Sequence, residues 1–446
     1  MTKQGNGPAK GPKEKGPSET IPARRLGEWE TFFYLVHEGL FGGPAVLCVS
    51  ARIAGALDIQ LVKHACRHLW ERHPPLRARI MATDGGPSFV FDVPFRDIPI
   101  HSFFELGRTN LHTVVEREVD TLFDASKHLW RVLLITDKTD FERHYLLLSL
   151  HHSISDGKSA VRLAGELILC CTGILAGEIL GADPLPLRPP LEDFIPSAGY
   201  TNPDTPPAAK GTHPGCEREG VMPFHEFQPT GRRHTRFRVH TLGPARSAAL
   251  EERCGRSGVT VNAALAASTL AAMRKHFGEG ALLSVDTPLS IRGYDRVQVG
   301  HDELWCMEIP VSTGYEGIAG RGVWQLARDY NDRLALVKSD GTNLFADVCR
   351  DPEKKIEELR TARHFPLSCL LIDAGRIGPV KGGPFVVESI GLTTGRQAAD
   401  HIMVVSVATV GKALSLTFAY ASPLIRESWA DSFINDFLHF LEKAVK

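Results

Sequence analysis

Two apolar runs that lead directly into a histidine-rich loop constrain this fold more than any other feature of the sequence. The runs are LWRVLLIT (Leu129 to Thr136) and HYLLLSL (His144 to Leu150), and the polar segment DKTDFE lies between them. Such runs predict adjacent antiparallel strands that are buried on both faces. The second run continues into HHSISDG (His151 to Gly157), and a helical pattern follows at about residues 158–174. The loop therefore lies on a strand-to-helix connection, where functional residues often concentrate.

The remainder of the chain alternates strand and helix patterns on both sides of a proline-rich segment. A strand pattern at residues 45–53 leads into a helical pattern, and the order strand, helix, strand returns at residues 234–290. Between them, PLPLRPPLEDFIP and TNPDTPPAAKGTHPG exclude regular helix and central strand. These patterns predict an α+β protein with two lobes, each a mixed sheet packed with helices. The expected parts are a disordered tail (1–20), an N-terminal lobe (21–180), a proline-rich crossover (181–232) and a C-terminal lobe (233–446).

The composition is that of a folded soluble protein and says little about a substrate. Hydrophobic residues make up 43% and charged residues 23% of the 446 residues, which is ordinary for globular proteins. The formal charge of -1 gives no electrostatic reason to expect nucleic acid or an anionic membrane as partner. The nine cysteines include no CxxC pair, which indicates reduced thiols and a cytoplasmic location.

Neither a signal peptide nor a membrane span is expected. The N-terminal segment MTKQGNGPAKGPKEKGPSE has no apolar stretch. The most hydrophobic segment, LILCCTGILAG (Leu167 to Gly177), has about half the length needed to cross a bilayer, so it is expected to be a buried helix. Single histidines such as His301 and His401 have no partners at metal-ligand spacing, and no metal site is expected.

HHSISDG supplies the residue types that acyl transfer to an alcohol or amine requires. The acceptor must lose a proton as it attacks, and a histidine with an ordinary pKa of about 6.5 suits a general base. His152 is the candidate for this base. Asp156 is expected to fix the loop, and Gly157 to permit a tight turn and the close approach of a slender substrate arm. On these residues alone a purely structural role stays open, because Asp-Gly turns and paired histidines are common in loops.

HHSISDGKS resembles the HHxxxDGxS signature of the chloramphenicol acetyltransferase-like superfamily, which includes the condensation domains of nonribosomal peptide synthetases. LDIQLVKHACRHLWERHPPLRARI is similar to a helix of that family that ends in RHxxLR, RLGEWETFF sits where those proteins begin, and GVTVNAALAASTLAAM with SVDTPLSIR resembles the start of their C-terminal lobe. The free-standing length and LPLRPPLEDFIP look most like the polyketide-associated and alcohol O-acyltransferases. The resemblance implies two chloramphenicol acetyltransferase-like lobes with an active-site tunnel between them.

The resemblance also implies roles for individual residues. His152 is the general base, Asp156 is a structural acid, and Arg77 is the expected ion-pair partner of Asp156. A carboxylate paired with arginine favours its charged form and positions a loop, so Asp156→Ala is expected to damage folding as well as rate. The candidate substrate contacts are His151, Ser155 and Arg292.

The expected reaction moves an acyl group from acyl-CoA or from a phosphopantetheine-linked carrier-protein thioester to a hydroxyl group of a small-molecule acceptor. Amide formation with an amine is the alternative reaction. No bound cofactor is expected, an acyl carrier protein is the alternative donor partner, and a monomer is expected because one chain supplies both lobes. The rival from another class is a catalytically silent member of the fold that binds a carrier or a partner protein.

Several departures from known patterns limit other assignments. SCLLIDAGRIGPV lacks the asparagine of the Ser-Asn-hydrophobic-Gly stretch of relatives, and the DFGWG motif of plant acyltransferases is absent, so the oxyanion-stabilising residues stay unassigned. A P-loop is excluded, because its first glycine would fall at His152. A serine hydrolase is disfavoured, because the sequence contains no G-x-S-x-G elbow.

Overall fold

Two large sheets form the frame of the protein. The computed structural model describes residues 23–105, 111–178, 180–181, 183–194, 220–294, 297–339, 351–378 and 384–445. One sheet has the strand order β14 (Phe385–Thr394), β2 (Val46–Gly55), β7 (Asp140–His151), β6 (Trp130–Asp137), β5 (Ile100–Glu105). The other has the order β11 (Glu308–Tyr315), β10 (Leu283–Ser290), β13 (Ser368–Ile377), β15 (Met403–Val410), β16 (Ala413–Ser422), β9 (His234–Leu242). The predicted α+β fold with two sheet-based lobes is confirmed.

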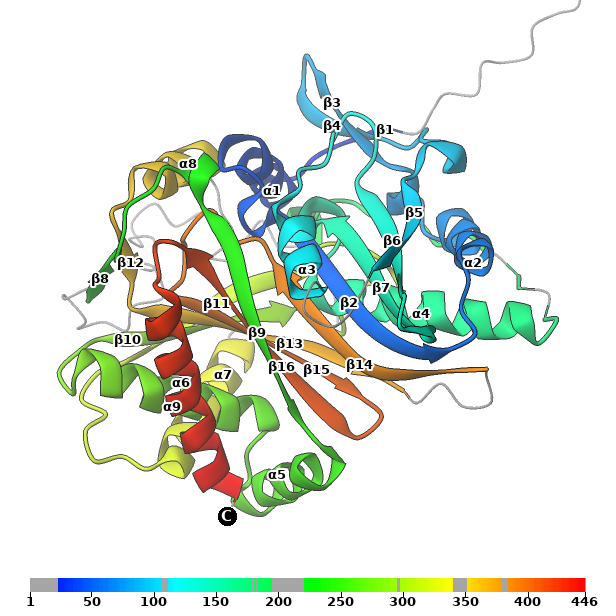
Figure 1. Ribbon diagram of the computed structural model, residues 1–446. Helices are drawn as coiled ribbons and strands as arrows, with labels where there is room; N and C mark the ends of the chain where they lie inside the picture. The colour runs from blue at the N-terminus through cyan, green and yellow to red at the C-terminus, as the bar shows by residue number, and fades with distance from the viewer. Residues whose placement is uncertain are drawn as a thin grey trace, which may run out of the picture.

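Helices and two small sheets surround this frame (Figure 1). The small sheets contain β1 (Ala23–Arg25), β4 (Gly86–Val90) and β3 (Arg79–Thr83), and β12 (His364–Pro366) with β8 (Val221–Pro223). The helices of the first half are α1 (Glu28–Gly39), α2 (Ile59–Arg72), α3 (Leu111–Asp120) and α4 (Gly157–Leu175). Those of the second half are α5 (Pro244–Ser257), α6 (Val261–Phe277), α7 (Val323–Ser339), α8 (Pro352–Thr361) and α9 (Glu427–Val445).

The strand pair that leads into the candidate loop has the predicted form. β6 and β7 are antiparallel, with Trp130 opposite Leu150. The last eight residues of β7 are buried, because β7 lies inside the sheet, between β2 and β6. The strand therefore delivers the loop to the interior of the protein.

The two halves of the chain are interleaved at one strand. β14 comes from the C-terminal half but pairs with β2 over nearly its whole length, as Figure 1 shows. β14 also contacts β15 of the other sheet. A single cut at residue 233 therefore does not separate the two sheets, and the proposed domain boundaries stay a prediction.

Short and edge strands were missed by sequence patterns. β11 was not among the predicted strands, and it contains Pro310, a residue that is unfavourable in a central strand. It lies at the edge of its sheet and pairs only with β10, so a proline is tolerated there. β10 alternates buried and partly exposed residues along its length, and its buried face packs on α6.

Two predicted segments lie outside the described residues. They are the tail 1–20 and residues 195–219 of the crossover.

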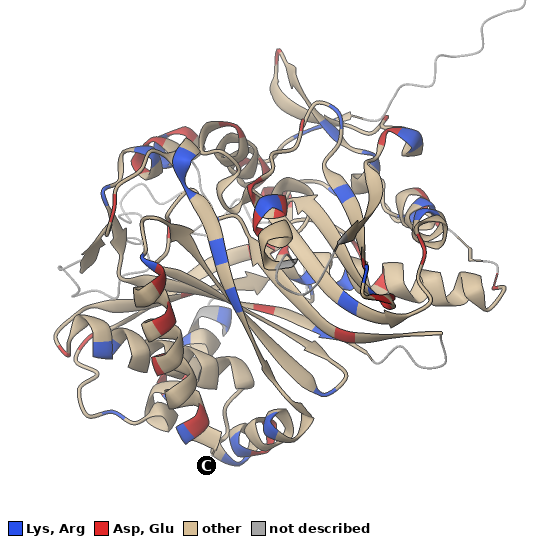
Figure 2. Cartoon of the chain, viewed as in Figure 1, with Lys and Arg blue, Asp and Glu red and all other residues tan. Residues whose placement is uncertain are grey.

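In the part that the structure describes, every cysteine is a free, buried thiol. No helix among these residues is both long and apolar enough to span a bilayer. Figure 2 shows Lys and Arg interspersed with Asp and Glu over both halves of the ribbon, as the balanced composition leads one to expect.

Candidate active site

The loop between β7 and α4 is fixed by a helix cap. β7 ends at His151, a 3-10 turn covers His152–Ile154, and Asp156 is the N-cap of α4. The Ser159 N–H donates to the Asp156 carboxylate at 2.8 Å, and the Asp156 N–H donates to the Ser159 hydroxyl at 3.0 Å. This reciprocal capping box sets the residue at which the helix begins.

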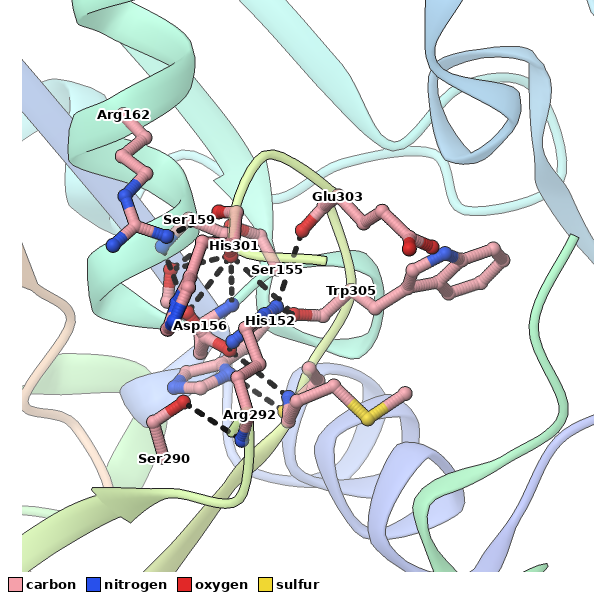
Figure 3. Close-up of polar contacts among 12 residues, drawn as sticks. His152, Ser155, Asp156, Ser159, Arg162, Ser290, Arg292, His301, Glu303 and Trp305 are labelled. Carbon is pink, nitrogen blue, oxygen red and sulfur yellow. Dashed lines mark hydrogen bonds and ion pairs between the residues drawn. The ribbon is translucent and has the colours of Figure 1, made fainter. Parts of the chain in front are cut away.

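A buried ion pair ties this loop to the second sheet. Arg292, which follows β10, donates from Nη1 to Asp156 Oδ2 at 2.5 Å, and the Met307 N–H donates to the same oxygen at 2.9 Å. The side chains are 1% and 0% exposed. Burial raises the pKa of the Asp156 carboxyl, but Arg292 and the hydrogen bonds outweigh it and hold the pKa below its ordinary value. Figure 3 shows this pair beside His152.

Arg77 is not the partner of Asp156, so that prediction was wrong. Arg77 Nη1 donates to the Glu71 carbonyl at 3.3 Å, and its guanidinium lies over the Trp70 ring, 5.8 Å from the centroid. It therefore closes the end of α2 within its own lobe. The true partner stands 136 positions from Asp156, a separation that leaves no local pattern to detect.

His151 and Ser155 support the loop from inside, and their assignment as substrate contacts stays a prediction. Both are 0% exposed. His151 Nδ1 accepts from the Ser153 N–H at 3.1 Å, and Ser155 Oγ donates to the Asp156 carbonyl at 3.0 Å. Buried side chains whose polar atoms bond to the loop itself stabilise its shape.

Arg292 is likewise bonded inside the protein, and its predicted contact with substrate stays a prediction. Beyond its bond to Asp156, it donates from Nη2 to the carbonyls of Glu303 and Trp305, at 3.2 and 2.7 Å. The guanidinium thus joins α4 to the segment 303–307 that leads into β11. Its role in this structure is to hold the two lobes together at the loop.

Gly157 occupies a place where a side chain does not fit without displacement. A Cβ at this position would lie 3.1 Å from Leu392 Cδ2 and 3.2 Å from Ile372 Cγ2. Leu392 belongs to β14 and Ile372 to β13, so the first turn of α4 packs against both sheets. The close approach at Gly157 comes from neighbouring strands.

His152 is the one residue of His151–Gly157 that is not buried. Its ring stacks on Phe33 of α1 with the centroids 3.7 Å apart, and its Nδ1 lies 3.7 Å from Cys306 Sγ. Although the side chain is partly exposed, the surrounding protein atoms desolvate the ring and lower the pKa of His152 to about 4, against the effect of Asp156 and two backbone carbonyls. The imidazole is therefore neutral near pH 7 and keeps a lone pair, as a general base requires.

Sequence patterns missed Phe33 and Cys306. Phe33 belongs to WETFF, whose aromatic rings pack on one another, and Trp29 stacks on Phe32 at 5.1 Å. These residues form a small apolar cluster beside His152 that also contains Cys306 and Ala398. The density of aromatic residues in WETFF was an available signal, whereas Cys306 stands 154 positions from His152 and had none.

The two unassigned histidines have different surroundings. The backbone carbonyl of His301 accepts a hydrogen bond from Arg162. His401 Nε2 lies 2.8 Å from Asp286 Oδ2, and its Nδ1 lies 3.1 Å from Asp400 Oδ2. Burial lowers the pKa of His401, but the two carboxylates outweigh it and raise the pKa to about 9. His401 is thus a cation within an ion-pair cluster.

A groove of about 360 Å³ lies along the flank of α4 and reaches Ser159 in its first turn. Its other walls include Arg72 of α2 and Asp302. Arg72 pairs with both Asp302 and Glu166. Arg162, in contrast, has no carboxylate partner among the residues that the structure describes. The lining of the groove holds three arginines and three carboxylates, and Arg162 is the arginine among them without a direct ion pair in the described part of the chain. Within residues 23–445, leaving aside the undescribed segments, no group of His, Cys, Asp and Glu is arranged to hold a metal ion.

Comparison with known proteins finds a family match in the first lobe. Residues 45–196 match the Condensation domain family. Curated relatives include cyclosporin synthetase of Tolypocladium inflatum, 32% identical over 187 residues, and bacitracin synthase 2 of Bacillus licheniformis, 28% identical over 127 residues. These alignments cover 40% and 28% of this chain but only 1% and 5% of those synthetases. The chain thus corresponds to a small part of much longer relatives.

Solved structures share the fold over nearly the whole chain. A trichothecene 15-O-acetyltransferase from Fusarium sporotrichioides has a TM-score of 0.73 at 13% identity and covers 97% of both chains. Polyketide synthase associated protein 5 from Mycobacterium tuberculosis has a TM-score of 0.71 at 17% identity, covering 95% of this chain and 99% of that one. The first condensation domain of the CDA synthetase has a TM-score of 0.71 at 15% identity, covering 95% of this chain and 96% of that one. The resemblance inferred from HHSISDG is confirmed, in sequence for the first lobe and in fold for both.

Proposed function

We propose that this chain, whose fold is that of condensation domains, transfers an acyl group from a thioester to a hydroxyl group with His152 as general base. The observation that carries the proposal is the contrast within the motif. His152 alone is partly exposed and holds a neutral imidazole, while the residues around it are buried and bonded to one another. A loop built only for structure has no need of one exposed base.

The chemistry follows from the protonation state of His152. The imidazole takes the proton of the acceptor hydroxyl as the oxygen attacks the thioester carbonyl carbon. The tetrahedral intermediate then collapses, the carbon–sulfur bond breaks, and the imidazolium returns its proton to the departing thiolate. Because the pKa of His152 is about 4, the imidazolium is a strong acid that gives up this proton readily. General catalysis of this kind contributes about 10²- to 10⁴-fold in rate.

Asp156 and Arg292 have a different task in this scheme. Their pair is buried and fully engaged, so neither exchanges a proton with the substrate. They hold the turn that carries His152 between the lobes. Because Arg292 keeps the pKa of Asp156 below its ordinary value, the carboxylate is a poor proton acceptor and does not act as a second base.

The donor thioester is proposed to approach along the groove beside α4. CoA and carrier-linked phosphopantetheine both carry phosphate, and Arg162 is a cation without a carboxylate partner among the described residues. The groove reaches the first turn of α4, next to the loop that presents His152. Its size suits a slender arm rather than a folded domain.

An ester product is the first choice, and an amide is the second. The same base would serve an alcohol and an amine. One structural neighbour is named as a 15-O-acetyltransferase, and the sequence relatives are peptide synthetases. Both acceptor classes therefore belong in the test.

The test is thiol release from acyl-CoA and from an acylated carrier protein, each combined with a panel of alcohols and amines. We expect acceptor-dependent release with wild-type protein and a loss of about 10²-fold or more in His152→Ala. His64→Ala, at an exposed position of α2, is the matched control and should retain activity. Equal activity in folded His152→Ala protein would exclude the mechanism. Binding of the acylated carrier without any turnover would favour the silent, carrier-binding alternative.

A further inference from the structure

Arg233, which directly precedes β9, is a buried cation without a carboxylate partner among the described residues. Its side chain belongs to a residue that is 2% exposed. Its Nε donates to the Gln228 carbonyl at 2.8 Å and its Nη1 to the Gln397 carbonyl at 2.9 Å. Its Nη2 is shielded from solvent and has no hydrogen-bond partner in the described part of the chain. A buried charge without an opposite charge is strongly destabilising, so a negative charge from outside these residues would stabilise Arg233.

A second arginine and two phenylalanine rings lie beside this cation. The Arg233 guanidinium lies over the Phe224 ring, 5.5 Å from its centroid, and the Arg363 guanidinium lies over the Phe227 ring at 4.1 Å. The two rings are nearly parallel, with centroids 6.4 Å apart. The Phe224 N–H also donates to the Arg363 carbonyl at 3.4 Å. We call Arg233, Arg363, Phe224 and Phe227 the two-arginine site.

The two-arginine site has an excess of positive charge. Burial and Arg363 lower the pKa of Arg233 to about 10, so the guanidinium is still a cation at pH 7. Arg363 is exposed and donates to two backbone carbonyls, and the described residues hold no carboxylate in an ion pair with either arginine. Glu226, which is close in sequence, is exposed and accepts a hydrogen bond from Gln228. The site is therefore suited to an anion.

The two-arginine site adjoins the apolar cluster beside His152. Gln397, whose carbonyl accepts from Arg233, directly precedes Ala398 of that cluster. The same cluster contains the phenyl ring and the thiol that contact His152. Helix α8, which ends two residues before Arg363, also packs on this cluster. None of the four residues of the two-arginine site lines the groove beside α4, so the site is distinct from the proposed donor path.

We propose that the two-arginine site binds the carboxylate or phosphate of an acidic acceptor whose hydroxyl group reaches His152. This inference rests on the proposed function and names its class of acceptor. The anion accepts hydrogen bonds from Arg233 Nη2 and from Arg363, and charge-assisted bonds of this kind are strong. Because Nη2 is shielded from solvent, the partly exposed Phe224 ring moves aside when the anion binds.

Anion binding is tested without a donor thioester, by melting temperature in inorganic phosphate or acetate against sodium chloride at equal ionic strength. Arg363→Gln is the test variant, because Arg363 is exposed and its loss leaves the hydrogen bonds of Arg233 in place. We expect saturable stabilisation of wild-type protein and a half-saturating concentration about tenfold higher in Arg363→Gln. Arg360→Gln is the matched control, because Arg360 is exposed and paired with Glu357 at 2.7 Å. Phosphate also stabilises proteins in general, so the difference between variants is the result.

The acceptor class is tested with pairs of acceptors that differ in one anionic group. The pairs are 3-hydroxybutyrate with its methyl ester, and glycerol 3-phosphate with glycerol. We expect wild-type protein to have the higher kcat/KM for the charged member of one pair, which identifies the anion as carboxylate or phosphate. This preference should fall about tenfold in Arg363→Gln and persist in Arg360→Gln.

The possible failures are distinguishable. Equal half-saturating concentrations in wild type and Arg363→Gln would overturn the anion site. Anion binding that depends on Arg363, in a protein that transfers acyl groups without preferring charged acceptors, would overturn the acceptor class. Anion binding that depends on Arg363, in a protein that transfers no acyl group to any acceptor, would support the site and overturn the proposed function instead.

Discussion

Two partly exposed histidines of this protein lie in different surroundings and have opposite protonation states. His152 stacks on an aromatic ring and touches a thiol, and its pKa is lowered to about 4. His401 lies between Asp286 and Asp400, and its pKa is raised to about 9. Burial lowers the pKa of both side chains. The difference lies in whether a carboxylate contacts the ring.

This contrast explains how one loop gains a base while another gains a structural ion pair. The acid that acts on His152 is Asp156, whose oxygens accept hydrogen bonds from Arg292, Met307 and Ser159. The charge of that carboxylate is therefore already balanced by Arg292, and the carboxylate does not stabilise a protonated His152 strongly. At His401, in contrast, the two carboxylates bind the imidazolium directly. A histidine becomes a base here because its neighbouring acid is already paired.

The largest effect is expected where the pairing of Asp156 is broken. Asp156→Ala leaves Arg292 charged and unpaired in the interior, and loss of one partner from a buried pair costs about 3–5 kcal/mol of unfolding free energy. Acyl transfer should fall with it, because the turn that carries His152 loses its cap. Urea unfolding and thiol release measure the two effects.

Arg77→Ala is the control for this prediction. Arg77 is bound only within its own lobe, so the loss should stay below about 1 kcal/mol. If Arg77→Ala lowers the unfolding free energy as much as Asp156→Ala does, Arg292 is not the ion-pair partner that stabilises the loop.

The second effect concerns the stability that His401 contributes. A pKa raised from 6.5 to about 9 corresponds to about 3 kcal/mol. Because the folded-state pKa is the higher one, this contribution is fully present below about pH 6.5 and is lost as the pH rises through about 9. His401→Asn should therefore destabilise the protein strongly at about pH 6 and little at about pH 9.5. A deficit that does not change with pH, measured by urea unfolding against His64→Asn, would remove the ion pair from the explanation.

A third prediction converts His152 into the state of His401. Cys306→Asp places a carboxylate next to the imidazole, and an opposite charge at this range raises a histidine pKa by about 1–3 units. The acid limb of the pH profile should move upward by that amount. Cys306→Asn, which is nearly the same size and uncharged, should leave the limb in place. A shift of equal size in both variants would show that packing, not charge, sets the pKa of His152.

The smallest effect is expected at the groove. Arg162→Glu reverses an exposed charge, so KM for a phosphate-bearing thioester should rise several-fold, about 1 kcal/mol, while kcat changes less than about twofold. Arg376→Glu, a groove residue that is already paired with Glu251, is the matched control. If both variants raise KM equally, Arg162 has no special place on the donor path.

Local patterns made the frame of this fold predictable. β6 and β7 consist largely of continuous apolar runs, and α4 begins directly after the capping Asp156. Each of these elements could therefore be placed from its own residues. β11 could not, because an edge strand tolerates the proline that argues against it. β14 was expected in the C-terminal lobe but pairs with β2 of the first sheet, because the residues of a strand do not determine which sheet it joins.

Only those residues of the candidate site that lie within one sequence segment could be predicted. His152, Asp156 and Gly157 lie within one motif and were identified together. The contacts that set their chemistry come from Phe33, Arg292 and Cys306, which the fold brings from distant parts of the chain. The choice of Arg77 in place of Arg292 failed for this reason, because an arginine anywhere in the chain satisfies the same electrostatic demand.

The acid limb of acyl transfer tests the central claim most directly. The profile of kcat/KM against pH reports the pKa of the free enzyme's essential base. For wild-type protein, in short assays checked for folding at each pH, we predict constant activity from about pH 7 down to about pH 5.5 and a midpoint at about 4, the pKa of His152. A midpoint near the ordinary histidine value of about 6.5, or above it, would show that the pKa of the base is not lowered and would contradict the carboxylate-free surroundings assigned to His152.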